Sequence, residues 1–530
     1  MTAHNSTELG SSRERQLAEL VQLVQSITSP KLHIPEGASE PSPVKGQDLR
    51  KLPDELEQLL RKCSDEGLGP EGFSNAVSLL SENSVNNASP GFLGKLVSAP
   101  SPPGTAADLF LSIFNNNGHV WRASPALTAV EKHVSKELAK LFGLEGPHAG
   151  GVTVPGGAAG NMLALLVARN IVSPESKQQG VAPGKYAIFV SDAAHYSVSN
   201  AAQIVGLGSD SVISVPALDD GTMDVEALAA AVDDAIQNGK KPLFINATAG
   251  NTVNGAFDSI DKIGEIARKA NAWFHVDACW GGAVAFSDNL RHLIKGSELA
   301  DSIAFNPHKM LGVPLVCAFL LTNDLRTFWL ANKLNAGYLF HDRTTGESEL
   351  SDNGVNGNNN EYDWRNSKLV EEAPDVADIR DLASLTVQCS RRSDATKLLL
   401  HWIYYGTRGI AREVEQAVDS AQYLATLVKA HPRLELIGDI DKVFAQVCFY
   451  WRPKGEEENG ASATALTAVV NSHNTRVLYE HLTEHGWKID YAPYNSTGEC
   501  IRIACNRLTT RRGVEALISV LVRLGESLGL

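Results

Sequence analysis

The 530-residue sequence lacks the features of three classes of protein. It contains no window of about 18 uninterrupted apolar residues, so we expect no membrane-spanning helix. Residues 1 to 15 are polar and lack the apolar core of a secretory signal. Basic residues number 47 against 61 acidic ones, and the net charge of −14 argues against binding nucleic acid through a basic face. We therefore expect neither a membrane nor a nucleic acid as a partner.

Paired cysteines and metal-ligand clusters are also missing. The seven cysteines are odd in number and scattered, without a Cys-x-x-Cys pair. This pattern is typical of reduced thiols in an intracellular protein and not of a disulfide framework. His195 has no second histidine at metal-ligand spacing, so no metal site is predicted. With 43% hydrophobic and 20% charged residues, the composition indicates a cytoplasmic globular enzyme.

The first part of the chain is predicted to be helical with polar interruptions. Apolar spacing predicts a helix over 13–28 that ends at Ser29-Pro30, and the proline-containing stretch 34–47 indicates a linker. Short helices are predicted over 52–61 and 72–80, followed by a polar loop. We divide this part into residues 1–50, an N-terminal helix and flexible linker, and residues 51–123, a helical segment.

Residues 124–405 are predicted to form a large α/β domain. Ser124 is predicted to cap a helix that has Pro125 in its first turn. Continuously apolar strands then alternate with helical patterns such as 224–237 and 259–270, which predicts a mostly parallel sheet covered on both faces. The candidate strands are 186–191, 212–215, 243–248, 273–277, 302–305 and 315–321.

Two further segments complete the predicted organisation. The polar insertion 341–381 has almost no core-forming residues over 354–360 and is predicted to be a mobile loop. Helices are predicted over 394–405 and 411–430. Residues 406–530 then form a smaller C-terminal α/β domain, with strands over 443–450 and 500–504 and helices over 475–485 and 511–528.

Four groups in the large domain could carry chemistry, and we interpret each as lying at a strand end of one sheet. Lys309 follows the turn Asn306-Pro307, and a partly desolvated lysine is a candidate to form a Schiff base. The glycine-rich turn 154–161 precedes an apolar helix whose free N–H groups would attract an anion such as phosphate. Asp277 needs a cationic partner if it is buried. His195 could stack on a flat ring or move protons.

Each group also has an ordinary structural interpretation. Lys309 could be a solvated surface charge, the glycines a tight strand-to-helix turn, Asp277 a turn cap and His195 a packed histidine. Ligands bind at the carboxyl ends of parallel strands, however, and pyridoxal phosphate needs an anion cradle, a stacking ring, a carboxylate and a lysine together. The combination therefore favours a pyridoxal phosphate site.

From about Pro90 to its C-terminus, the chain resembles the group II pyridoxal-phosphate-dependent amino-acid decarboxylases, and most closely their glutamate and cysteine-sulfinate branch. The resemblance implies the aspartate-aminotransferase-like fold, known as fold type I, and an intertwined homodimer to which residues 51–123 contribute. The matching motifs are 155–158, 194–195, 206–211, 247–252, 255–258, 275–278, 306–314 and 388–394.

The resemblance also implies roles for individual residues. Lys309 would form the Schiff base with the cofactor, Asp277 would pair with its ring nitrogen, and His195 would stack above the ring. Arg502 would hold the α-carboxylate of the substrate, a bidentate task that suits a guanidinium. The remaining cofactor contacts would come from Ala158 and Ala159 at the phosphate, Ala278 beneath the ring, and Thr252, Asn306 and His308 around it.

The sequence departs from the family pattern in the parts that select the substrate. Lys95 stands where the glutamate branch has a glutamine that contacts the substrate side chain, and a lysine there favours an acidic substrate unless it is a surface charge. Asn117 matches a pocket asparagine, whereas His119 replaces an aromatic residue. In the long insertion, Tyr362 is the candidate for the tyrosine that protonates Cα. Without such a tyrosine, transamination or oxidative deamination becomes the expected side reaction.

The sequence therefore predicts α-decarboxylation of an acidic L-amino acid: glutamate, aspartate or cysteine sulfinate. Decarboxylation of an aromatic or basic amino acid is the alternative, because the same scaffold supports it. A non-catalytic homologue that serves as a binding partner is disfavoured by the intact set of Lys309, Asp277 and His195.

Overall fold

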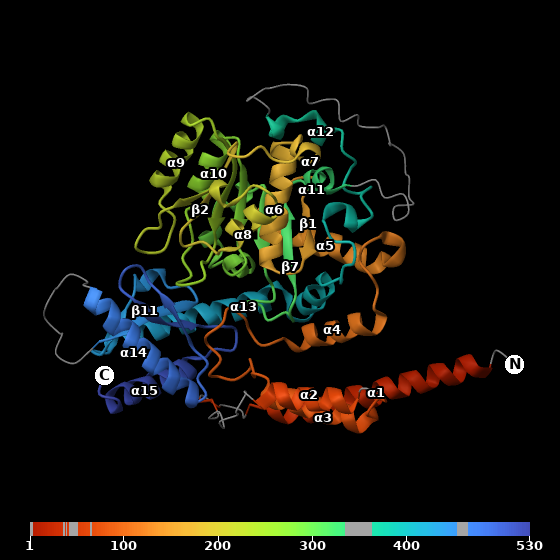
Figure 1. Ribbon diagram of the computed structural model, residues 1–530, viewed down its shortest axis with the longest axis vertical. Helices are drawn as coiled ribbons and strands as arrows, with labels where there is room; N and C mark the ends of the chain where they lie inside the picture. Colours follow the sequence, from red (N-terminus) through yellow and green to blue (C-terminus); the bar gives the residue numbers. More distant parts are fainter. Residues whose placement is uncertain are drawn as a thin grey trace.

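The computed structural model describes residues 4–34, 38, 40–41, 51–63, 66–333, 363–452 and 465–530. Its N-terminal helices are α1 (His4–Leu32), α2 (Leu52–Lys62) and α3 (Gly69–Asn83), and they lie together below the rest of the chain (Figure 1). Helix α1 contains Pro30 and ends two residues beyond it, so the predicted end at Ser29-Pro30 is wrong. Because proline has no N–H, the last turn of α1 lacks the hydrogen bond that residue 30 would otherwise donate to the Ser26 carbonyl.

Helix α4 (Pro102–Phe114) was not predicted, although its N-terminus carries a clear signal. The Ser101 hydroxyl accepts a hydrogen bond from the Gly104 N–H, and prolines occupy the first two helical positions. Ser124 precedes α5 (Pro125–Leu141), but the prediction that it caps this helix is wrong. The Ser124 hydroxyl is buried and makes no capping bond. Proline alone therefore marks the start of α5.

The large domain is built on a seven-stranded sheet with the order β1-β7-β6-β5-β4-β2-β3. Strand β7 pairs antiparallel with both β1 and β6, and the remaining neighbours pair parallel. The predicted mostly parallel α/β sheet is confirmed. The strands are β1 (Gly150–Val154), β2 (Tyr186–Ser191), β3 (Val212–Val215), β4 (Lys241–Thr248), β5 (Trp273–Asp277), β6 (Ser302–Phe305) and β7 (Ala318–Thr322).

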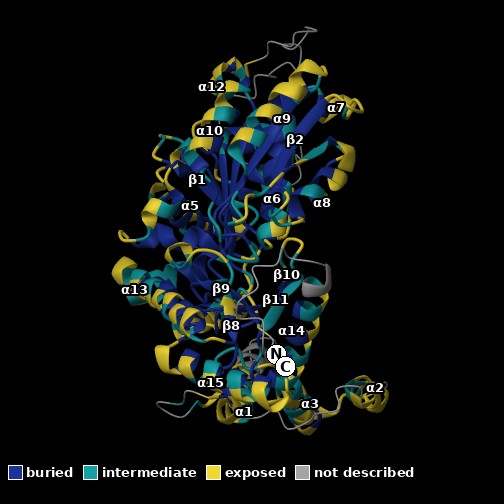
Figure 2. Cartoon of the chain, turned by 90° about the vertical axis from the view of Figure 1, so that its left-hand side faces the viewer, coloured by how far each residue is buried: buried dark blue, intermediate teal, exposed yellow. Residues whose placement is uncertain are grey.

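Helices cover both faces of this sheet, as continuously apolar strands require. One face packs against α5, α9 (Val225–Gln237), α10 (Ile260–Lys269) and the first half of α13. The other face packs against α6 (Gly157–Val172), α8 (Ser197–Ile204) and α11 (Leu325–Asn332). Burial is concentrated in the sheet and in the helix surfaces turned toward it (Figure 2).

Residues 363–381 differ from the predicted mobile loop. They contain α12 (Lys368–Glu371), and the buried Trp364 stacks on Trp273 with ring centroids 5.1 Å apart. Arg365 donates to both carboxylate oxygens of the partly buried Asp301, at 2.5 and 2.7 Å. A tryptophan and an arginine thus attach this polar stretch to the core. The rest of the predicted loop, through Tyr362, lies outside the described residues.

Helix α13 (Ala395–Ala430) joins the large domain to the small one (Figure 1). The two helices predicted here meet at Gly406, where the backbone is not helical and a φ of 66° favours glycine. The small domain has a four-stranded antiparallel sheet with the order β10-β11-β9-β8. Its elements are β8 (Leu434–Leu436), β9 (Gln446–Trp451), β10 (Asp490–Pro493), β11 (Glu499–Ala504), α14 (Ala465–Glu484) and α15 (Arg511–Ser527). None of the helices in the described ranges is long and apolar enough to cross a membrane.

Candidate active site

Lys309 stands at the carboxyl end of β6, which is fully buried between β5 and β7. The Lys309 N–H donates to the Asn306 carbonyl at 3.0 Å and so closes the turn that contains Pro307. The segment before α4 packs against this turn, because the Ser98 N–H donates to the Lys309 carbonyl at 2.9 Å. Both contacts fix the backbone of Lys309 while its side chain stays partly accessible.

Asp277 lies at the carboxyl end of the neighbouring strand β5 and is 7% exposed. Its Oδ2 accepts from the Asn161 amide at 2.8 Å, and its Oδ1 accepts from the Cys279 N–H at 3.1 Å. Burial raises the pKa of the Asp277 carboxyl, but the nearby Lys309 ammonium and these two hydrogen bonds outweigh it, so the pKa is lowered overall. Asp277 is therefore held as a carboxylate beside Lys309.

Sequence reasoning missed a buried network that positions Asp277. His275 is fully buried, and burial lowers its pKa to about 4, so its ring is neutral. Its Nε2 bonds to the Asn161 oxygen at 3.0 Å and its Nδ1 to the Ser302 hydroxyl at 2.8 Å. The Asn161 amide also donates to the Ser197 hydroxyl at 2.8 Å. The period of two along β5 places His275 on the same face as Asp277, and this was the available signal.

His195 follows β2 and lies near both charges. Burial lowers the pKa of the His195 imidazole, the Asp277 carboxylate raises it and the Lys309 ammonium lowers it. The Ser197 N–H donates to Nδ1 of His195 at 3.3 Å, at the start of α8. The structure therefore brings Lys309, Asp277 and His195 together, as the sequence predicted.

The N-terminus of α6 lies at the same end of the sheet. Gly156 has a φ of 101°, and a Cβ on Gly157 would lie 2.4 Å from the Cys279 sulfur, so only glycine fits there. Ala158 and Ala159 form the first turn, whose N–H groups suit an anion. The Asn306 Oδ1 is buried without a hydrogen-bond partner. A lysine, a carboxylate, a neutral imidazole and an anion cradle fit pyridoxal phosphate.

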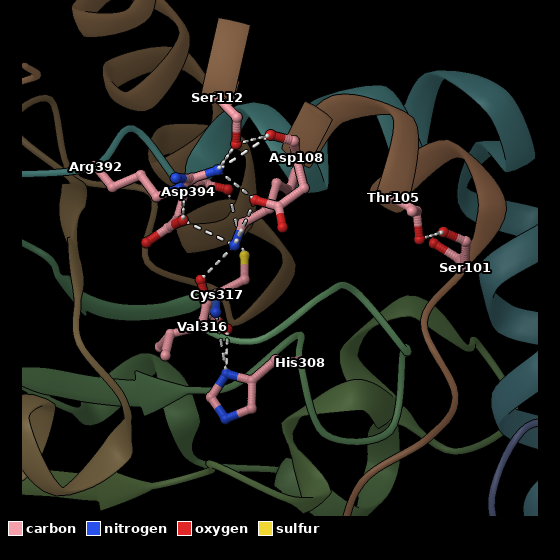
Figure 3. Close-up of polar contacts among 10 residues, drawn as sticks. Ser101, Thr105, Asp108, Ser112, His308, Val316, Cys317, Arg392 and Asp394 are labelled. Atoms are coloured by element: carbon pink, nitrogen blue, oxygen red, sulfur yellow. Dashed lines mark hydrogen bonds and ion pairs between the residues drawn. The ribbon is translucent and has the colours of Figure 1, made fainter. Parts of the chain in front are cut away.

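His308 is anchored behind the lysine turn (Figure 3). Its Nδ1 lies 2.7 Å from the Cys317 carbonyl oxygen, and burial lowers its pKa to about 4. Beyond Cys317, the buried Lys397 ammonium bonds to the Val316 carbonyl and to the Asp394 carboxylate, both at 2.8 Å. This ionic cluster holds the loop that supports His308. The predicted contacts of His308, Ala278 and Thr252 with a cofactor stay predictions.

Lys95 and Arg502 meet at one carboxylate that sequence reasoning missed. Asp490 Oδ2 accepts from Lys95 Nζ and from Arg502 Nη2, each at 2.8 Å. Arg502 also donates to the backbone carbonyls of Thr252 and Gly94, each at 2.7 Å. Thr252 lies in the loop after β4, beside the Asp277 strand. The two predicted substrate-binding cations thus share a partner.

Asn117 and Tyr362 are not brought into this cluster. In the part of the chain that the structure describes, the Asn117 side chain accepts from the Arg391 N–H at 2.9 Å and has no bond to Lys309, Asp277 or His195. Tyr362 lies outside the described residues. Among residues whose positions are described, no group of three or more His, Cys, Asp and Glu side chains could hold a metal ion.

Comparison with known proteins gives concordant matches. The model of the pyridoxal-dependent decarboxylase conserved domain matches residues 70–356 and 366–452. The chain is 65% identical over 524 residues to "glutamate decarboxylase-like protein FG08083" of Gibberella zeae, covering 98% of this chain and 99% of the relative. It is 39% identical over 462 residues to "L-aspartate decarboxylase dtxS4" of Metarhizium robertsii, covering 87% and 84%. The crystal structure of mouse CSAD superimposes with a TM-score of 0.81 at 29% identity, covering 97% and 99%.

Proposed function

The chain belongs to the pyridoxal-dependent decarboxylases, and from that premise we propose that its substrate is an acidic L-amino acid: glutamate, aspartate or cysteine sulfinate. The enzyme is an amino-acid decarboxylase that uses pyridoxal phosphate. The predicted family, fold class and cofactor are therefore confirmed. The proposal concerns the side chain that the enzyme prefers.

The observation that carries this proposal is the charge of the cluster formed by Lys95, Asp490 and Arg502. Lys95 and Arg502 bring two cations and Asp490 brings one anion, so the three side chains keep a net positive charge. Arg502 would take the α-carboxylate, which every amino acid has. Lys95 is then the cation left for a second acidic group on the substrate. The names of the two relatives, a glutamate decarboxylase-like protein and an L-aspartate decarboxylase, support the same substrate class.

Each residue of the site has a task in this proposal. Pyridoxal phosphate, when bound, supplies an electron sink for the electrons that remain when CO2 leaves. Lys309 would hold the cofactor through its Nζ, which the substrate amine would replace. Asp277, which accepts a hydrogen bond from the Asn161 amide, would keep a proton on the ring nitrogen of the cofactor. His195 would pack over the ring, and burial lowers the pKa of its imidazole, which favours the neutral form. Tyr362 is proposed to protonate Cα.

Replacing Lys95 with methionine tests the substrate class. Methionine keeps most of the side-chain volume but removes the charge, so kcat/KM for acidic substrates should fall roughly tenfold to a hundredfold. The value for neutral amino acids should change far less. Lys442→Met is the matched control, because Lys442 forms an exposed ion pair with Asp220 and no bond that the structure describes joins it to Lys95, Asp490 or Arg502. Equal losses for acidic and neutral substrates would contradict the proposal.

We also propose a homodimer in the cytoplasm. Helix α4 exposes a run of large apolar side chains that no described segment covers, namely Leu109, Phe110, Ile113 and Phe114. The seven cysteines are all free, which fits a reducing compartment. Light scattering of the purified protein should give twice the chain mass of 56.9 kDa. A stable particle of single-chain mass would contradict the dimer.

A further inference from the structure

Asp490 accepts two cations on a single carboxylate oxygen, at 2.8 Å each. We propose that Asp490 is a specificity-determining residue. It pairs with Lys95 until the side-chain carboxylate of an acidic substrate replaces Asp490 as the partner of this lysine. The inference rests on the proposed substrate class and adds the residue with which such a substrate competes.

The backbone fixes this arrangement before any ligand arrives. Asp490 on β10 stands directly opposite Arg502 on β11 in the antiparallel pairing. The strand-like segment before Lys95 packs beside them, because the Leu93 N–H donates to the Lys488 carbonyl at 3.0 Å. A Cβ on Gly94 would lie 2.5 Å from the Ile489 carbonyl, so the close approach of the two segments needs glycine. The Asp490 carboxylate is therefore presented to Lys95 by three packed segments.

The two cations differ in how tightly they are held. The Arg502 side chain is 7% exposed and bonds to Asp490 and to two backbone carbonyls. The Lys95 side chain is 68% exposed, and in the described part of the chain Asp490 is the partner of its ammonium. An exposed lysine pair contributes little stability and is easily exchanged. Lys95 is thus the cation that can move to a ligand.

Asp490 does not lose all its partners when Lys95 leaves. Its Oδ2 keeps the Arg502 guanidinium, and its Oδ1 accepts from the Tyr491 N–H at 3.0 Å. The exchange therefore leaves no buried charge unpaired, which would be costly. The exchange still has a cost, because the incoming carboxylate must replace the Lys95–Asp490 ion pair and lie near the negative charge of Asp490. A ligand without a second charge does not meet this cost.

Binding of an inert dicarboxylate to the holoenzyme isolates this step from catalysis. Glutarate has no amine and cannot react, and its monomethyl ester has the same chain with one charge fewer. Calorimetric titration of the wild type, Asp490→Asn, Lys95→Met and the double variant with both ligands gives a full cycle. Glu435→Gln, which breaks an exposed ion pair with Arg452 in the small domain, is the control.

We expect Asp490→Asn to bind glutarate about tenfold more tightly. The variant has no negative charge at position 490 to repel the ligand, and no Lys95–Asp490 ion pair has to break. The ester should gain at least about threefold less than glutarate, because it places one carboxylate near Asp490 and not two. In the Lys95→Met background the gain for glutarate should be at least about threefold smaller, because no lysine is left to exchange.

Three results would overturn the inference: unchanged glutarate affinity in Asp490→Asn, equal weakening of both ligands, or a gain that is the same with and without Lys95. Equal weakening would mean that Asp490 only positions Arg502. An assay of CO2 release from acidic amino acids on the same preparations separates the two claims. If acidic amino acids release no CO2 while the glutarate pattern holds, the proposed function fails alone. If they release CO2 while the pattern is absent, only the role of Asp490 fails.

Discussion

Replacing Lys309 with alanine should lower CO2 release by more than about a thousandfold, because the variant loses the amine that we propose to hold the cofactor. The lysine stands on a turn that hydrogen bonds to Asn306 and Ser98 fix, and alanine has no Nζ to make the covalent bond. The wild-type protein should show the visible absorbance of a Schiff base, and the variant should lose that lysine-linked band. An assay of trapped CO2 and an absorbance spectrum measure both effects.

A lysine elsewhere on the surface controls for general damage. Lys442→Ala breaks the exposed pair with Asp220 and should leave both the spectrum and the rate near those of the wild type. If Lys309→Ala keeps the lysine-linked band or more than a few per cent of the rate, another residue holds the cofactor and the assignment is wrong.

Asp277→Asn should reduce kcat by about a hundredfold to ten-thousandfold, with a smaller effect on KM. The Asp277 carboxylate lies on the strand beside Lys309. The Lys309 charge and the hydrogen bonds that Asp277 accepts lower the pKa of Asp277. An asparagine cannot keep a proton on the ring nitrogen, so the ring becomes a poorer electron sink. Because its pKa is lowered, Asp277 stays ionised at pH values below those at which an ordinary aspartate becomes protonated. Protonation of Asp277 should therefore not reduce kcat near neutral pH.

Asp301→Asn provides a control with a partly buried carboxylate at the other end of the sheet. Asp301 precedes β6, whereas Lys309 follows it, and its partner is Arg365. Its loss should lower the free energy of unfolding by about 2 to 4 kcal/mol, because Arg365 is left without its partner, while kcat stays near the wild-type value. If Asp277→Asn lowers stability in the same way but retains kcat, Asp277 has a structural role only.

The sequence predicted the parts of the site that depend on strand ends. Buried strands must end somewhere, and Lys309, Asp277 and His195 each follow an apolar run, so a parallel sheet brings them to one edge. The strands β8 and β10 of the small domain were missed because they are short and their apolar pattern is weak. The glycines of β1 hid that strand in the same way.

Contacts between segments distant in the chain could not be predicted. Asn161 meets Asp277 across 116 residues, and Lys95 meets Asp490 across 395. Neither pair has a local pattern, because the partner of a polar side chain is set by packing and not by spacing. The attachment of residues 363–381 by Trp364 was missed for a similar reason, since a polar stretch can be held by one buried ring.

The central claim is that this enzyme decarboxylates acidic L-amino acids, and the most direct test is a panel of the common amino acids with cysteine sulfinate added. CO2 and the amine product should be measured together with cofactor-saturated enzyme. We expect CO2 and amine in equal amounts from glutamate, aspartate or cysteine sulfinate, with kcat/KM well above that of any aromatic or basic amino acid. Turnover confined to aromatic or basic substrates, or CO2 release with an aldehyde or keto product in place of the amine, would contradict it.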